Sequence, residues 1–126
     1  MTRLLLVAAG GAIGSVGRYL VALWSGQMTS EDRFPLGTLA VNLIGCLAIG
    51  LVAGLGERTN ALTADTRLFL MTGVIGGFTT FSAFGLETAL MIKRDDLVTA
   101  LAYVAVSVAG GLAAIWCGYL IAARIA

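Results

Sequence analysis

The sequence contains no histidine, one proline and two cysteines, and only 12% of its 126 residues are charged. Without histidine, a Ser-His-Asp catalytic set is excluded and the usual nitrogen ligand of zinc or haem is missing. Cys46 and Cys117 stand apart in apolar runs, which is typical of small buried side chains rather than of a metal site. Neither a phosphate loop of the GxxxxGK[ST] type nor a cluster of carboxylates is present. We therefore expect no enzyme.

The scarcity of charge also argues against a soluble domain. Apolar residues make up 59% of the chain, and a soluble protein of this length would need far more charge on its surface. A lipid bilayer removes that requirement because it solvates apolar side chains. The net charge is +1 without a basic cluster, so nucleic acid is not an expected partner.

Four apolar runs are long enough to cross a bilayer, which takes about 20 residues each. They cover about residues 4–24, 36–55, 67–92 and 97–123. The first run is too long for a signal-peptide core and contains Arg18, so we interpret it as a retained span. Because the four runs nearly fill the sequence, we predict an all-α membrane protein with a single transmembrane domain over residues 1–126.

The positive charges are nearly balanced between the two ends of these spans. Four alternating spans place both termini and the loop near residues 57–66 on one side, with Arg3, Arg58, Arg67 and Arg124. The other side carries Arg33, Lys93 and Arg94, joined by Arg18 if it reaches that interface. Orientation normally follows an asymmetry of cations. We therefore expect insertion in both orientations, for which an antiparallel, dual-topology homodimer is a natural assembly.

The centre of the third run is unusually polar. Paired glycines, Gly76 and Gly77, precede Thr79, Thr80 and Ser82, and this composition weakens a helix. A break at membrane depth is tolerated only where protein or water satisfies the backbone. Freed carbonyls can then bind a cation and freed N–H groups an anion. A simple kink is the alternative, but it does not account for so concentrated a polarity. We favour a functional break in the middle of the membrane.

Other residues in the spans have two readings each. Phe78, Phe81 and Phe84 could turn their positive ring edges towards an anion, although packing against neighbouring helices is the commoner role of phenylalanine. Asn42 could coordinate an anion through its NH₂ group or join two helices by a hydrogen bond. The sequence leaves both open.

Charged and hydroxyl side chains in the spans are equally ambiguous. Arg18 is either functional or reaches the interface by extending its side chain, and Glu87 could pair with it, line a vestibule or reach the headgroups. Tyr103 and Ser107 lie one turn apart on one helix face, where both can donate hydrogen bonds.

Three segments together resemble the Fluc family of fluoride channels. They are GGAIGSVGRY (residues 10–19), GTLAVNLIG (residues 37–45) and GGFTTFSAF (residues 76–84). The segments occur in the first three spans, in the family's order and spacing, and the resemblance extends over nearly the whole chain. It implies an antiparallel dual-topology homodimer with two fluoride pathways between the subunits, in a bacterial inner membrane.

The resemblance also implies roles for individual residues. Asn42 would lie at the pore, where Phe81 and Phe84 would present their ring edges to fluoride. The backbone carbonyls of Gly76 and Thr79 from both subunits would hold a structural sodium ion. The remaining polar residues would form a track (Ser82, Tyr103 and Ser107) and a vestibule (Arg18 and Glu87).

Two positions depart from the family pattern, and two other classes compete with it. Ala83 and Gly111 stand where the family usually has threonine and serine, so the polar track could be thinner in this chain. A small multidrug transporter would need a carboxylate in its first span, and residues 4–24 contain none. A non-conducting assembly subunit would need neither the polar break nor Asn42. We therefore predict a channel for passive, electrodiffusive export of fluoride.

Overall fold

The computed structural model describes residues 1–26, 34–59 and 62–125, and these residues form helices joined by short connections. The elements are α1 (Thr2–Trp24), α2 (Leu36–Arg58), α3 (Ala64–Arg67), the π-helix η1 (Leu68–Ile75), α4 (Gly76–Phe78), α5 (Phe81–Lys93) and α6 (Leu97–Ile125). Arg33, one of the cations counted above, lies outside the described residues. Its contribution to the charge balance therefore stays a prediction.

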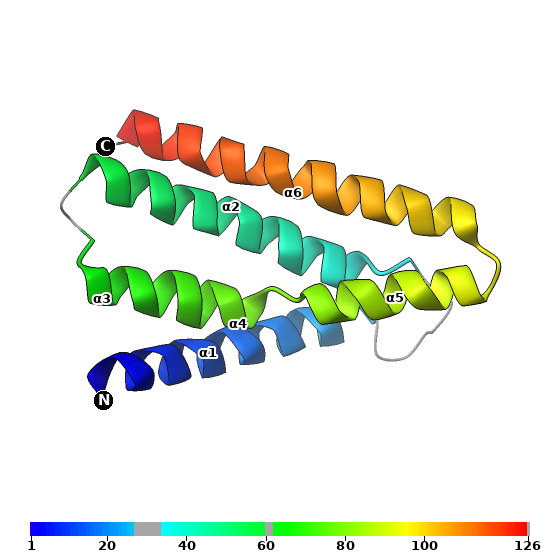
Figure 1. Ribbon diagram of the computed structural model, residues 1–126, viewed down its shortest axis with the longest axis horizontal. Helices are drawn as coiled ribbons and strands as arrows, with labels where there is room; N and C mark the ends of the chain where they lie inside the picture. The colour runs from blue at the N-terminus through cyan, green and yellow to red at the C-terminus, as the bar shows by residue number, and fades with distance from the viewer. Residues whose placement is uncertain (27–33, 60–61, 126) are drawn as a thin grey trace.

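Four helical stretches in the described part of the chain are long and apolar enough to cross a membrane. They are Thr2–Trp24, Leu36–Arg58, Ala64–Lys93 and Leu97–Ile125. This result confirms the predicted all-helical chain with four spans, and the chain is a multi-pass membrane protein. Figure 1 shows that successive spans alternate in direction, so that the N-terminus, the C-terminus and the connection between α2 and α3 lie at one end.

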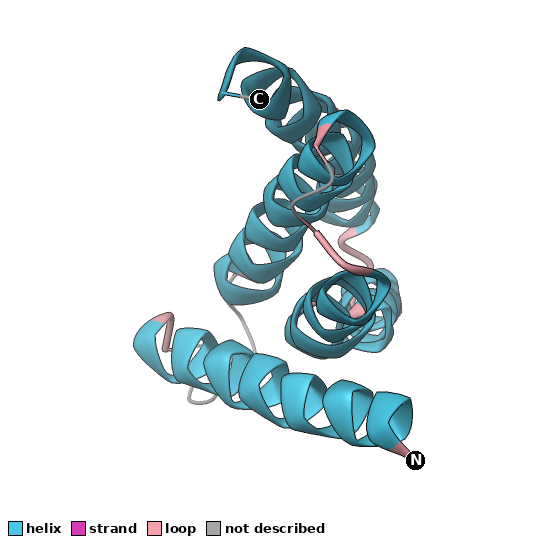
Figure 2. Cartoon of the chain, turned by 90° about the vertical axis from the view of Figure 1, so that its left-hand side faces the viewer, coloured by secondary structure: helices cyan, strands magenta, loops and turns pink. Residues whose placement is uncertain are grey.

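The helices form two pairs. α2 packs most extensively against α6, whereas α1 packs against η1 and α4 and contacts α2 little. Both pairs depend on glycine, because no side chain would fit where the backbones meet. Between α2 and α6, a Cβ at Gly118 would lie 2.8 Å from the Leu51 nitrogen. Between α1 and η1, a Cβ at Gly10 would lie 2.7 Å from the Phe69 carbonyl oxygen. Figure 2, viewed from the end that holds the termini, shows α1 strongly inclined to the other helices.

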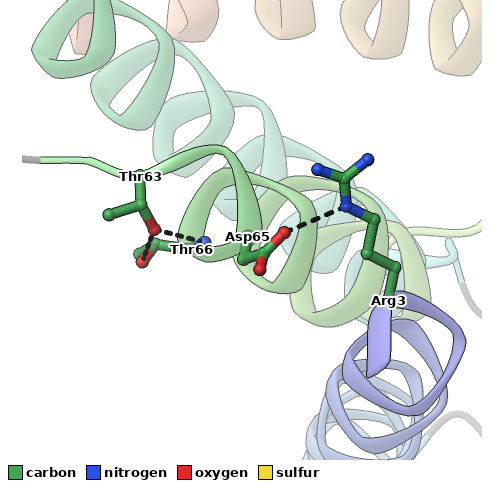
Figure 3. A network of polar contacts seen from close by, with 4 residues as sticks. All are labelled: Arg3, Thr63, Asp65 and Thr66. Atoms are coloured by element: carbon green, nitrogen blue, oxygen red, sulfur yellow. Dashed lines mark hydrogen bonds and ion pairs between the residues drawn. The ribbon is translucent and has the colours of Figure 1, made fainter. Parts of the chain in front are cut away.

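An ion pair joins the two elements that begin at the end with the termini. Arg3 Nε lies 3.1 Å from Asp65 Oδ1. Thr63 caps the N-terminus of α3 by accepting from the Thr66 N–H, and Figure 3 draws both contacts. Both side chains of the ion pair are largely exposed, at 72% and 53%. A pair so accessible contributes at most about 1 kcal/mol.

Few side chains are fully buried within one copy of the chain. Tyr103 and Val41 are the largest of them among the described residues. Tyr103 belongs to a small core with Met91 and Ala100, against which Leu39 and Phe84 pack. This core connects α2, α5 and α6 beyond the broken part of the third span, and it holds Phe84 and Tyr103 in place.

Candidate functional site

The third span is interrupted at Thr79 and Thr80. Both residues adopt extended backbone, with ψ values of 158° and 112°, between the end of α4 and the start of α5. The helix restarts because the Thr80 hydroxyl accepts a hydrogen bond of 3.2 Å from the Ala83 N–H, as an N-cap residue does. The structure is thus consistent with the predicted break. It also contains the π-helical segment η1, which the short helix α4 separates from the interruption and which the sequence does not predict.

Asn42 joins α2 to the break. Its Oδ1 accepts from the Thr80 N–H at 2.8 Å, and its Nδ2 donates to the Thr80 carbonyl at 3.1 Å. Asn42 Oδ1 therefore replaces the helical partner that the Thr80 N–H loses at the interruption. Asn42 Nδ2 adds a second hydrogen bond to the Thr80 carbonyl, which as that of an N-cap residue already accepts the first bond of α5. Of the two readings of Asn42, the structure contains the interhelical hydrogen bond. The second N–H of the Asn42 amide takes no part in these two hydrogen bonds to Thr80.

Arg18 reaches the break from α1. Its Nη1 donates to the Thr79 carbonyl at 3.3 Å, and Ser15, about one turn earlier, donates to the Gly77 carbonyl at 3.5 Å. Arg18 is partly buried in this contact. The Arg18 guanidinium thus donates to a carbonyl of the interrupted helix. Such pairing with backbone carbonyls offsets part of the free-energy cost of placing a cation within a membrane span.

A cavity of about 380 Å³, which we call the break groove, lies beside the interruption. Its lining includes six of the residues predicted for the site: Asn42, Gly76, Thr79, Phe81, Phe84 and Ser107. The Ser107 hydroxyl oxygen is buried and has no hydrogen-bond partner among the described residues. Phe81, by contrast, is 83% exposed, and its ring centroid lies 5.5 Å from that of Phe84. The groove thus combines hydrogen-bond donors with aromatic rings.

A second cavity, of about 390 Å³, lies between α1, α2 and α5. We call it the vestibule cavity, and it is lined by both residues predicted for a vestibule, Arg18 and Glu87. The Glu87 carboxylate accepts a hydrogen bond of 2.6 Å from the Thr38 hydroxyl and one of 2.7 Å from the Tyr103 hydroxyl. These two hydroxyls fix the orientation of the carboxylate at the edge of the cavity.

The other predicted site residues lie apart from both cavities. Ser82 is exposed and shares a hydrogen bond of 3.3 Å with the Thr80 hydroxyl. Tyr103 is fully buried, and its ring centroid lies 5.2 Å from that of Phe84. Tyr103 and Ser107 therefore contact different parts of the site, although they lie one turn apart on α6.

Sequence reasoning missed Thr38 and Cys46 as residues lining these cavities. Thr38 stands near the start of an apolar span, where threonine is common and carries no signal. Its carboxylate partner Glu87 is 49 residues away, so no local pattern could have found the contact. The apolar run around Cys46 predicts a small buried side chain and gives no sign that Cys46 lines a cavity. Its place beside Asn42 on the α2 helix was the only available hint.

Fold and site together define a small multi-pass membrane protein whose broken third span is lined by donors and aromatic rings. The chain belongs to the family described as CrcB-like protein, Camphor Resistance (CrcB), which it matches over residues 5–119. It is 52% identical over 126 residues to the Fluoride-specific ion channel FluC of Caulobacter sp. (strain K31), covering 99% of this chain and 98% of the relative. A protein of the same name from Methylobacillus flagellatus is 44% identical, and the match covers 94% of this chain and 93% of the relative. One from Paracoccus denitrificans is 50% identical, and the match covers 90% of this chain and 89% of the relative.

Proposed function

We propose that this chain is a fluoride-selective channel that lets fluoride leave the cell passively. The observation that carries the proposal is the break groove. There Asn42, Phe81, Phe84 and Ser107 line one cavity. The Ser107 hydroxyl oxygen is itself buried and has no hydrogen-bond partner among the described residues. Fluoride is small and strongly hydrated, so a selective path must replace its water with close donors that still release the ion. Hydroxyl, amide and ring-edge groups meet that requirement, and the names of the close relatives agree with it.

The direction of transport follows from elementary electrostatics. Hydrogen fluoride crosses membranes as a neutral acid and dissociates in a neutral cytoplasm, which traps the anion. A negative membrane potential drives an anion outwards at about 2.3 kcal/mol per charge per 100 mV. A passive channel in a bacterial inner membrane would therefore protect the cell from fluoride toxicity without any coupling to another energy source.

The test is ion efflux from liposomes that contain the purified protein, with fluoride and chloride electrodes in one vessel. We expect rapid fluoride release and no chloride release. Protein that is folded and oligomeric but releases neither ion would contradict the proposal.

An antiparallel homodimer is the assembly that we propose for this function. Gly76, at the start of the short helix before the interruption, and Phe81, at the start of the helix after it, are both exposed on the surface of one copy. Broken backbone facing lipid would leave polar groups unsatisfied, which a membrane does not tolerate. A second copy seated over this face would cover it, and the balanced cations permit the opposite orientation that such a pairing needs. Cross-linking in native membranes should give dimers, and single-cysteine labelling should find each terminus on both sides.

The same interruption could hold the structural sodium ion that the family resemblance implies. In an unbroken helix the Thr80 N–H would donate to the Gly76 carbonyl, but here it donates to Asn42, so the Gly76 carbonyl is released. The Thr79 carbonyl accepts from Arg18 and keeps a second lone pair. Carbonyl oxygens from two copies would offer a hard cation four ligands. Replacing sodium with a large organic cation should then lower dimer stability as well as fluoride efflux, whereas unchanged stability would contradict the site.

A further inference from the structure

Four aromatic rings form a continuous series that we call the aromatic row: Phe81, Phe84, Tyr103 and Phe34. The ring centroids of Phe81 and Phe84 lie 5.5 Å apart, and those of Phe84 and Tyr103 lie 5.2 Å apart. Phe34 meets Tyr103 from the other end, at 5.4 Å and an interplanar angle of 81°. Tilted and edge-to-face pairs at these separations attract one another. Because Phe81 and Phe84 line the break groove, the row extends from the groove to Phe34.

The backbone attaches Phe34 firmly to the start of α2. Pro35, the only proline in the sequence, follows it, and the Leu36 N–H donates to the Phe34 carbonyl at 2.7 Å. The Pro35 carbonyl in turn accepts from the Leu39 N–H at 3.0 Å, which ties the proline to the first turn of the helix. A proline fixes its own φ and restricts the residue before it. The Phe34 ring therefore meets Tyr103 from a well-anchored position.

Tyr103 is the ring through which Phe34 reaches the groove. It is fully buried, and its hydroxyl donates to the Glu87 carboxylate at 2.7 Å. This hydrogen bond fixes the position of the hydroxyl oxygen but not the plane of the ring, because rotation about the axis through that oxygen keeps the bond intact. The plane depends on the rings that pack against it, which are Phe34 and Phe84.

The orientation of the Phe84 ring matters for an anion in the groove. An aromatic ring has a positive edge and a negative face, so a change of tilt turns attraction of an anion into repulsion. A hydroxyl group can rotate its hydrogen towards an ion. A ring edge is directed only by the side chains that pack against the ring.

We propose that Phe34 is a positioning residue of the fluoride pathway. It restricts the plane of Tyr103, and Tyr103 holds Phe84 in the orientation that directs a ring edge towards the ion. Phe34 is not among the described residues that line the groove, so it acts through Tyr103. This inference rests on the proposed function and deepens it, because it assigns a pathway role to a residue outside the groove.

The first test compares fluoride efflux from liposomes. Phe34→Leu keeps an apolar side chain without a ring and should lower efflux about fivefold, within the range for one lost aromatic pair. Phe34→Tyr keeps the ring and should conduct within about twofold of the unsubstituted chain. Trp24→Leu is the matched control, because it removes an exposed ring at the same end of the bundle, and it should leave efflux unchanged. Phe34→Met, which also lacks a ring, replaces the leucine variant if that variant does not fold.

A spectroscopic test follows the Phe84 ring itself. In protein with ¹³C-labelled phenylalanine rings, the nuclear magnetic resonance signals of Phe84 are identified by their absence from the Phe84→Leu variant. Phe34→Leu should shift or broaden these signals, because the ring can then reorient, and Phe34→Tyr should leave them in place. Phe78 is the internal control, since its ring lies against α1 at Gly17.

Equal efflux from the Phe34→Leu variant and the unsubstituted chain would overturn the inference. Slow efflux with unchanged Phe84 signals would overturn it as well, because Phe34 would then act by another route. Equally slow Phe34→Leu and Phe34→Tyr variants would also contradict it, since the aromatic ring would not be what position 34 supplies. An unsubstituted chain that releases no fluoride would instead overturn the proposed function, and the resonance comparison would still test the aromatic row.

Discussion

At the scale of single residues, Asn42 is the side chain on which the shape of the interruption depends. Asn42→Asp keeps the acceptor for the Thr80 N–H but turns the donor towards the Thr80 carbonyl into a second, negatively charged acceptor. We expect this change to abolish fluoride efflux and to lower stability by about 2–3 kcal/mol, the cost of an unsatisfied buried polar group. Chemical unfolding in detergent and liposome efflux measure the two effects. Ile44→Ala, at an exposed neighbour on α2, is the control. Native efflux from the Asn42→Asp variant would contradict this role.

Tyr103 and Glu87 form a second contact whose strength can be measured. Tyr103→Phe removes the hydroxyl that donates to the Glu87 carboxylate and should destabilise the protein by about 1.5–3 kcal/mol, the usual value for a hydrogen bond to a charged group. Because Glu87→Gln alters the same contact, the double variant should cost clearly less than the sum of the two single variants. Strict additivity in a thermal unfolding series would mean that the two side chains act independently.

Polar residues inside apolar runs were the part of the site that could be predicted. Asn42 and Arg18 stood out because amides and cations are costly in lipid, and both contact the interruption. Their backbone partners are 38 and 61 residues away, so no local pattern could have indicated which atoms they bind. Tyr103 and Ser107 illustrate the same limit. Helical spacing placed them on one face, but only the packing of α2, α5 and α6 separates their contacts.

At the scale of elements, the contact between α1 and η1 depends on glycine at Gly10. A Cβ there would lie 2.7 Å from the Phe69 carbonyl oxygen and 2.9 Å from the Gly73 Cα, so Gly10→Ala must push the helices apart. We expect a loss of about 1–3 kcal/mol, as for overpacking in a core. Gly11→Ala is the matched control, because a Cβ at Gly11 meets nothing within 4 Å among the described residues. Similar unfolding midpoints for the two variants would show that α1 is not packed as tightly as described.

The positions of the spans followed from the sequence because bilayer thickness fixes how long an apolar run must be. The interruption also followed from it, since two glycines and two threonines in close succession oppose a helix. The π-helix η1 did not. Its residues, Leu68–Ile75, are mostly apolar and carry no pattern that predicts a π-helix, and the segment packs against α1. The sequence therefore predicts where the third span is interrupted, but it does not predict the π-helical geometry of η1.

At the scale of the whole molecule, cations lie at both ends of the bundle. The end with the termini carries Arg3, Arg58, Arg67 and Arg124. The other end carries Lys93, the last residue of α5, and Arg94, and the prediction of a near balance adds Arg33 and Arg18 to these two. The salt bridge between Arg3 and Asp65 is exposed, and such a pair adds at most about 1 kcal/mol to stability. The distribution of cations between the two ends acts instead on how the chain is oriented in the membrane.

Removing cations from one end alone should force a single orientation. Arg58→Gln/Arg124→Gln and Lys93→Gln/Arg94→Gln bias the chain in opposite directions. If the working unit is an antiparallel dimer, each double variant alone should lose at least about tenfold of its fluoride efflux, because partners of the opposite orientation become scarce. Co-expression of the two should restore it. Labelling of single cysteines at the chain ends with a membrane-impermeant reagent checks the orientation of each variant. A double variant that is fully oriented one way and still conducts at the original rate would rule out the antiparallel assembly and favour a parallel one.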